Sequence, residues 1–187
     1  MKEIWQSEKV IAQTQLMARS LKHWTGRDLF GARTARPPVG VQTSAGAPNN
    51  PAVCEAKFQT TGGQAVRAPL NLAAEIFHAS FILVSHGTEA DPVLNYGNAA
   101  ALALWEMPWA ELTRTPSRLT AEAPNREERA RLLAAVTANG FIDDYSGIRI
   151  SKTGRRFHIA QATVWNLLDE RGIYSGQAAM FSRWEFL

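Results

Sequence analysis

Residues 141–181 read FIDDYSGIRIS (141–151), KTG (152–154), RRFHIAQATVWNLLD (155–169), ERG (170–172) and IYSGQAAMF (173–181). This stretch holds three β-rich runs, and Gly154 and Gly172 stand where hairpins would turn. Three consecutive strands after a helical region predict an α+β domain with one antiparallel sheet. The stretch contains no nucleophile elbow, phosphate loop or metal-ligand pair, so it favours a binding or sensing domain over an enzyme.

The residues before this stretch predict two short strands and several helices. Residues 81–84 (FILV) form a buried-strand run, and residues 93–96 (VLNY) form a second. Three asparagines can cap helices at their N-termini: Asn71, Asn98 and Asn125. In this order of elements, helices cover one face of the sheet. A small cavity between helices and sheet is then the natural place for a ligand.

The chain divides into three predicted segments: an N-terminal helix (1–30), a linker (31–70) and a folded domain (71–187). The helix carries apolar residues on one arc at helical spacing, namely Ile4, Val10, Ile11, Met17, Ala18, Leu21 and Trp24. It either packs on its own domain or pairs with a second copy, and the sequence leaves both open. The linker is rich in Gly and Pro and keeps no regular period, so we expect a mobile linker or a long excursion.

Composition indicates a globular protein with no nucleic-acid or membrane partner. Lys and Arg exceed Asp and Glu by five in residues 1–70 but fall short by two in residues 71–187. The domain therefore lacks the excess positive charge that a phosphate backbone attracts. The longest apolar runs are too short to span a bilayer. Because Cys54 is the single cysteine and no signal-peptide core is present, we expect a cytoplasmic protein.

Several motifs in the folded segment resemble a known family. They are SHGTEADPVLNYGN (85–98), ALALWE (101–106), PSRLTAE (116–122), NGFIDDYSGIRISKTGRRF (139–157) and ATVWNLLDE (162–170). Together they are similar to the MEKHLA domain family, a PAS-like group, over most of the predicted domain. The resemblance implies a PAS-like fold and a sensory or regulatory role. It implies no catalytic mechanism and leaves the ligand and any cofactor unknown.

MEKHLA domains occur as stand-alone bacterial proteins and at the C-terminus of plant class III homeodomain-leucine-zipper transcription factors. The sequence shows no homeodomain or zipper, so the resemblance implies the stand-alone bacterial type, and the plant DNA-binding role does not transfer. Light-sensing PAS domains need a cysteine close to a flavin in the helical layer. Cys54 lies in the predicted linker, so we do not expect flavin photochemistry.

Large and polar residues on the elements around the predicted cavity are its candidate lining. The candidate ligand-binding residues are Tyr96, Trp105, Met107, Trp109, Arg118, Leu119, Asp144, Ile148, Ile150 and Trp165. Aromatic and methionine side chains can hold a planar or apolar ligand, and a buried Asp144–Arg118 pair would add a polar anchor. The same large residues are more often plain core, Trp105 and Trp165 first.

His86 is the candidate acid/base group, with Asp91 or Asp144 as its carboxylate. The alternative is a loop histidine that hydrogen-bonds to backbone. Two ligands in one loop without a third do not define a metal site, so we expect no metal. His158 is expected to face solvent, because strand alternation places its two apolar neighbours in the core.

We therefore expect a non-catalytic sensory or regulatory module that binds a small apolar or aromatic ligand or a protein partner. A homodimer through the N-terminal helix or the sheet would transmit the signal. Two alternatives stay open: a small cavity enzyme that uses His86, and a dimerisation scaffold with a filled core.

Overall fold

The computed structural model describes residues 3–31, 68–121 and 126–187. The predicted linker lies almost entirely outside the described residues, as do Cys54 and the Asn125 cap. Within the described ranges no helix is long and apolar enough to cross a membrane.

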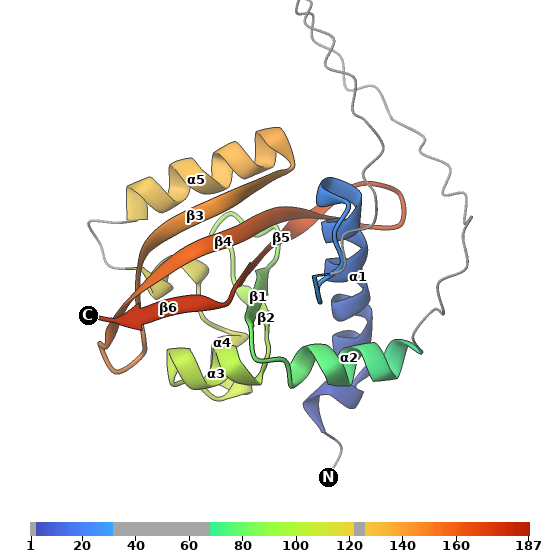
Figure 1. Cartoon of the computed structure of the whole chain (residues 1–187), viewed down its shortest axis with the longest axis horizontal. Helices are drawn as coiled ribbons and strands as arrows, with labels where there is room; N and C mark the ends of the chain where they lie inside the picture. The colour runs from blue at the N-terminus through green and yellow to red at the C-terminus, as the bar shows by residue number, and fades with distance from the viewer. Residues whose placement is uncertain (1–2, 32–67, 122–125) are drawn as a thin grey trace, which may run out of the picture.

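The centre of the domain is a six-stranded antiparallel sheet (Figure 1). Its strands are β1 (Ile82–His86), β2 (Leu94–Gly97), β3 (Phe141–Ile150), β4 (Arg156–Leu168), β5 (Tyr174–Phe181) and β6 (Arg183–Phe186). The order across the sheet is β2-β1-β5-β4-β3, and β6 pairs with the first part of β4. The predicted α+β class and the three-strand meander are confirmed. The short strand β6 was not expected from the sequence.

Five α-helices and two short 3-10 turns surround the sheet in the described part of the chain. They are η1 (Ile4–Gln6), α1 (Glu8–Thr25), α2 (Pro69–Phe77), α3 (Ala99–Trp105), α4 (Trp109–Leu112), η2 (Ser117–Thr120) and α5 (Arg126–Asn139). In Figure 1, α1 lies to the right of the strands and α2 at the lower right, α5 lies above β3, and α3 and α4 lie below the strands.

Two of the predicted helix caps fall on described residues, and only one of them forms. Asn98 caps α3, because its Oδ1 accepts a hydrogen bond from the Ala101 amide at 3.1 Å. The Asn71 prediction is wrong: α2 already begins at Pro69, where proline fits the first helical turn because no intrahelical donor is needed there.

The sheet is covered on both faces. On the face that we call the α1 face, Met17 and Leu21 of α1 are buried in one apolar cluster with Leu83 and Trp165 of the sheet. The Trp165 indole also donates to the Met17 carbonyl at 3.2 Å. The opposite face, which we call the cavity face, carries a second apolar cluster that includes Trp105. The N-terminal helix therefore packs on its own domain.

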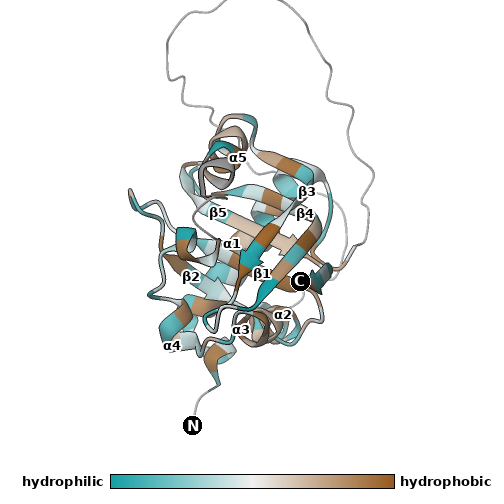
Figure 2. Ribbon diagram, turned by 90° about the vertical axis from the view of Figure 1, so that its left-hand side faces the viewer, coloured by the Kyte–Doolittle hydropathy of each residue, from teal (hydrophilic) through white to brown (hydrophobic). Residues whose placement is uncertain are grey.

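Apolar residues, brown in Figure 2, are interspersed with polar ones along the strands. In β4 the alternation matches the prediction, because Phe157 and Ile159 are buried and His158 between them is only half-buried. Alternation alone does not hold along the whole strand pair, however.

Two compensating bulges interrupt the pairing of β3 with β4. Between Ile142 and Tyr145 the register shifts by one residue in β3, where Asp144 takes a φ of 64°. Between Tyr145 and Gly147 the register shifts back by one residue in β4, where Gln161 takes a φ of 55°. One extra residue turns every following side chain to the other face of a strand. The second half of β3 therefore presents Tyr145 and Gly147 to the cavity face.

Candidate functional site

A cavity of about 60 Å³ lies on the cavity face of the sheet, beneath α3 and α5. A single buried water needs roughly 10–15 Å³ on this scale, so the space admits several atoms. The lining side chains come from eight elements of the fold: Val84, His86, Leu94, Trp105, Thr120, Leu132, Leu133, Tyr145, Arg149, Ile159, Ala162, Val164, Gln177, Ala179 and Phe181.

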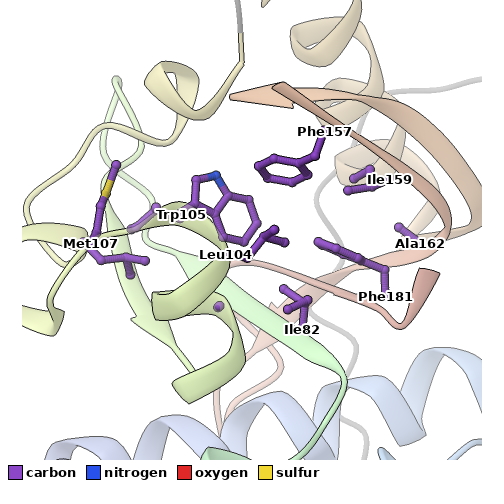
Figure 3. Close-up of a cluster of buried hydrophobic side chains, with 11 residues drawn as sticks. Ile82, Leu104, Trp105, Met107, Phe157, Ile159, Ala162 and Phe181 are labelled. Atoms are coloured by element: carbon purple, nitrogen blue, oxygen red, sulfur yellow. The ribbon is translucent and has the colours of Figure 1, made fainter. Parts of the chain in front are cut away.

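An aromatic wall forms the α3 side of this cavity. The Trp105 ring meets Phe157 edge-on with centroids 5.4 Å apart, and meets Phe181 at 6.2 Å. Figure 3 shows these three rings facing one another between α3 and the strands. Edge-to-face pairs of this kind hold each other in place, so the wall is pre-formed.

Two amides on neighbouring strands join the sheet to α5. The Gln177 amide donates to the carbonyl of Leu133 and to the Asn166 side-chain oxygen, at 3.0 Å each. Asn166 in turn donates to the Val136 carbonyl at 2.9 Å. α5 therefore rests on polar contacts to the sheet beside the cavity.

Two polar atoms of the lining have no hydrogen-bond partner among the described residues: Nε1 of Trp105 and Oε1 of Gln177. Trp105 and Gln177 are 3% and 1% exposed. Buried polar groups in native proteins are nearly always paired, so these two atoms are positions where a molecule in the cavity, water included, can form hydrogen bonds.

Tyr145 and Arg149 of β3 complete the lining on a third side. The Arg149 guanidinium donates to the Tyr145 hydroxyl at 2.8 Å and to the Ile148 carbonyl at 2.9 Å. The guanidinium carbon also stands 5.2 Å from the centroid of the Tyr145 ring. These three contacts hold a cation at the cavity although Arg149 is only 7% exposed.

The structure places one predicted site residue, Trp105, in this lining. Met107 is buried in the same apolar cluster as Trp105. Tyr96 and Trp165 belong to the α1 face, and Trp109 meets the Tyr96 ring edge-on at 5.7 Å. The ten predicted residues are therefore divided between the two faces and the surface.

The remaining predicted residues lie away from the cavity. Leu119 and Asp144 are exposed, and Asp144 sits at the β3 bulge. The residue opposite Ile148 is His158, so Ile148 and its i+2 neighbour Ile150 point to the face opposite Arg149. The predicted Asp144–Arg118 anchor is wrong, because Asp144 faces solvent.

The carboxylates proposed for acid/base chemistry also face solvent. Asp91 forms an ion pair with Arg118 at 3.0 Å, and both side chains are about half exposed. His86 is buried at the cavity, with Nδ1 2.8 Å from the Gly87 carbonyl. The convergence of His86 with Asp91 or Asp144 that the enzyme alternative requires is therefore not formed. The described residues contain no group of three potential metal ligands.

Comparison with known proteins bears on the resemblance found in the motifs. Residues 56–186 match the model of the MEKHLA domain. The chain belongs to the MEKHLA domain family. A curated relative is the homeobox-leucine zipper protein ATHB-14 of Arabidopsis thaliana, which is 24% identical over 182 residues. The match covers 97% of this MEKHLA chain and 18% of the plant protein. Since that relative is a plant protein, the stand-alone bacterial type stays a prediction.

Solved structures agree with the predicted fold. The PAS domain of a protein from Colwellia psychrerythraea matches with a TM-score of 0.53 at 12% identity, covering 63% of this chain and 94% of that one. An RNA-binding light-oxygen-voltage receptor matches with a TM-score of 0.55 at 17% identity, covering 67% and 36%. The MEKHLA domain described here therefore has a PAS-like fold.

The sequence missed four lining residues with polar side chains: Thr120, Tyr145, Arg149 and Gln177. For Gln177 a signal was present, because it stands among small and apolar residues in 173–181, which predict a buried central strand. Burial of a glutamine amide costs free energy unless the amide is hydrogen-bonded, so this residue indicates a polar contact. For Tyr145 and Arg149 strict alternation gave the wrong face, because it cannot locate the bulge at Asp144.

Proposed function

We propose that this MEKHLA domain is a non-catalytic sensory or regulatory module whose cavity binds a small apolar or aromatic molecule. The observation that carries the proposal is the pre-formed cavity itself, which combines an aromatic wall with the buried and unpaired polar atoms of Trp105 and Gln177. Ligand sites are typically concave and mostly apolar with a few convergent polar groups.

Ligand binding is favoured by the two buried polar atoms of the lining that have no partner among the described residues. A buried unpaired donor or acceptor costs about 1–3 kcal/mol, so a ligand that pairs with Trp105 or with Gln177 removes part of this penalty. Gln177 also donates a hydrogen bond to α5, so a change in the cavity can be transmitted to this helix. The response is a shift in α5 docking, in line with population-shift behaviour.

The proposed module acts as a homodimer, and it functions in the cytoplasm without nucleic acid. The apolar arc of α1 is already buried on its own sheet, so dimer contacts would use other surfaces. Exposed apolar side chains on β6, Trp184 and Phe186, are one such surface.

Native mass spectrometry of the purified protein tests the proposal. A bound ligand appears as extra mass that is lost on denaturation, and the same spectrum gives the oligomeric state. Ala162→Leu fills the cavity and is expected to remove the extra mass, whereas Ala103→Leu on the exposed side of α3 leaves it in place. An adduct that survives Ala162→Leu would place the ligand elsewhere and overturn the cavity proposal.

A further inference from the structure

Arg149 is a buried cation that needs explanation. Its side chain lies on the cavity face because the bulge at Asp144 turns the second half of β3 over. Burial of an ionised group is costly unless an opposite charge or a full set of hydrogen bonds compensates for it. The partners of Arg149 therefore decide whether the charge is satisfied within the chain.

The two hydrogen-bond partners that the described residues give Arg149 are neutral. The guanidinium has five N–H donors, and its hydrogen bonds go to the Ile148 carbonyl and the Tyr145 hydroxyl. Among the residues that the structure describes, no carboxylate lies within 4.0 Å of it. The part of the chain that the structure describes thus leaves the charge and several donors of Arg149 available to a ligand in the cavity.

Gly147 provides the space in which this pair of side chains is arranged. A Cβ atom at Gly147 would clash with the Tyr145 hydroxyl and would stand 3.4 Å from Nη1 of Arg149. The segment Tyr145-Ser-Gly-Ile-Arg149 therefore carries a tyrosine and an arginine on one face of the strand with an open position between them. Such an arrangement orients the guanidinium before any ligand arrives.

We propose that the cavity takes a small monocarboxylate with an apolar or aromatic body, and that Arg149 binds its carboxylate. This inference rests on the proposed function of the cavity. The planar fork of an arginine matches a carboxylate, with two parallel N–H to oxygen bonds. Arg149 is the single Lys or Arg side chain of the described lining, which suits one negative charge rather than a phosphate dianion. The aromatic wall around Trp105 accommodates the apolar body.

Matched probes separate the contribution of the carboxylate to the binding affinity from that of the apolar body. Phenylacetate and phenylacetamide have the same apolar body and differ in charge, and inorganic phosphate tests a bare anion. Isothermal titration of the full chain should show phenylacetate binding roughly tenfold or more tighter than the amide, since hydrogen bonds to charged groups are the strong ones. Arg149→Met should reduce the affinity for phenylacetate to that for the amide, while Arg183→Met on the exposed strand β6 changes neither.

A stability measurement guards against a purely structural role. If Arg149 serves a ligand, Arg149→Met keeps or raises the urea midpoint of the ligand-free protein, because the variant removes a buried unmatched charge. A lowered midpoint with unchanged phenylacetate affinity would make the arginine structural and overturn the inference.

Failure of the inference differs from failure of the proposed function. Equal affinity for phenylacetate and its amide, or competition by phosphate at equal concentration, overturns the carboxylate assignment but leaves a cavity that binds molecules. A neutral ligand identified by mass has the same consequence. If neither phenylacetate nor phenylacetamide binds and no native adduct is found, both proposals are overturned together.

Discussion

The side-chain amide of Gln177 donates to the side-chain oxygen of Asn166 across neighbouring strands at 3.0 Å. Each of the two residues also donates to carbonyls of α5, so the pair fastens this helix to the sheet. The side-chain nitrogen of Gln177 thereby bonds to the helix, and its side-chain oxygen, which has no partner among the described residues, lies at the cavity.

Replacing Gln177 by alanine should loosen α5 without unfolding the domain. The change leaves the Leu133 carbonyl and the Asn166 side-chain oxygen without this donor, at a cost of about 1–3 kcal/mol. Amide hydrogen exchange should therefore accelerate in residues 131–139 by about tenfold or more while the central strands keep their protection. Gln15→Ala on α1 is the matched control. Uniform acceleration over the whole domain would contradict a local role for Gln177.

Gly140 and Gly154 offer a matched test of how α1 is seated. Both have a φ of 88°, so alanine at either position carries the left-handed backbone cost of roughly 1–2 kcal/mol. The two positions differ in space, because a Cβ at Gly140 would overlap the Trp24 ring whereas one at Gly154 meets nothing within 4 Å. The Trp24 indole also donates to the Asn166 carbonyl at 2.9 Å.

Gly140→Ala should consequently lower the free energy of unfolding more than Gly154→Ala does. The additional loss should be about 1–3 kcal/mol, which is typical of overpacking. Urea unfolding of the two variants measures the difference. Equal losses of stability in the two variants would show that Trp24 at the end of α1 does not pack against Gly140.

The elements of the fold could be predicted from the sequence because their signals are local. Strand propensity, turn glycines and the Asn98 cap each depend on a few adjacent residues. The position of the bulge in β3 is set by distant partners instead. Asp143 accepts hydrogen bonds from Arg27 at 2.5 Å and from Thr163 at 2.8 Å, and both partners lie far away in the sequence.

The candidate site depends on that bulge, which is why most of its predicted residues lie elsewhere. Without a bulge, Ile148 and Ile150 face the cavity and Arg149 faces away. With it, Arg149 and Tyr145 line the cavity and the isoleucines take the other face. A similar register shift between β1 and β2 places Tyr96 opposite Ser85, on the α1 face. Sequence periodicity assigns a face only as far as the next bulge.

Tyr96 gives a prediction about alkaline pH. Its ring is fully buried, and burial raises the pKa of its phenol well above the ordinary value near 10. The folded protein keeps the proton while the unfolded chain loses it, so this contribution to stability is present below about pH 10 and fades as the pH rises above it. Tyr96→Phe should abolish this part of the loss of stability at alkaline pH.

Tyr96→Phe should also be neutral or stabilising near neutral pH. The Tyr96 hydroxyl finds no hydrogen-bond partner among the described residues, and removing an unpaired buried hydroxyl recovers about 1 kcal/mol. Urea midpoints at about pH 8 and pH 11 test both statements, with Tyr145→Phe as a comparison, since the Tyr145 hydroxyl is paired with Arg149. A destabilised Tyr96→Phe at neutral pH would show that the hydroxyl is bonded in solution.

Asn98 should be among the most sensitive positions of the fold, because one buried side chain joins three elements. Its Oδ1 accepts from the amides of Ala101 in α3 and Leu83 in β1 at 3.1 Å each, and its Nδ2 donates to the carbonyls of Phe81 at 2.7 Å and of Ile76 in α2 at 3.3 Å. Asn98→Ala removes a helix cap worth about 0.5–2 kcal/mol and leaves buried backbone groups unpaired at about 1–3 kcal/mol. Asn71→Ala on the exposed side of α2 should change stability by no more than about 0.5 kcal/mol. Urea unfolding of both variants measures the contrast, and similar small losses would mean that Asn98 does not organise the junction of β1 and α3.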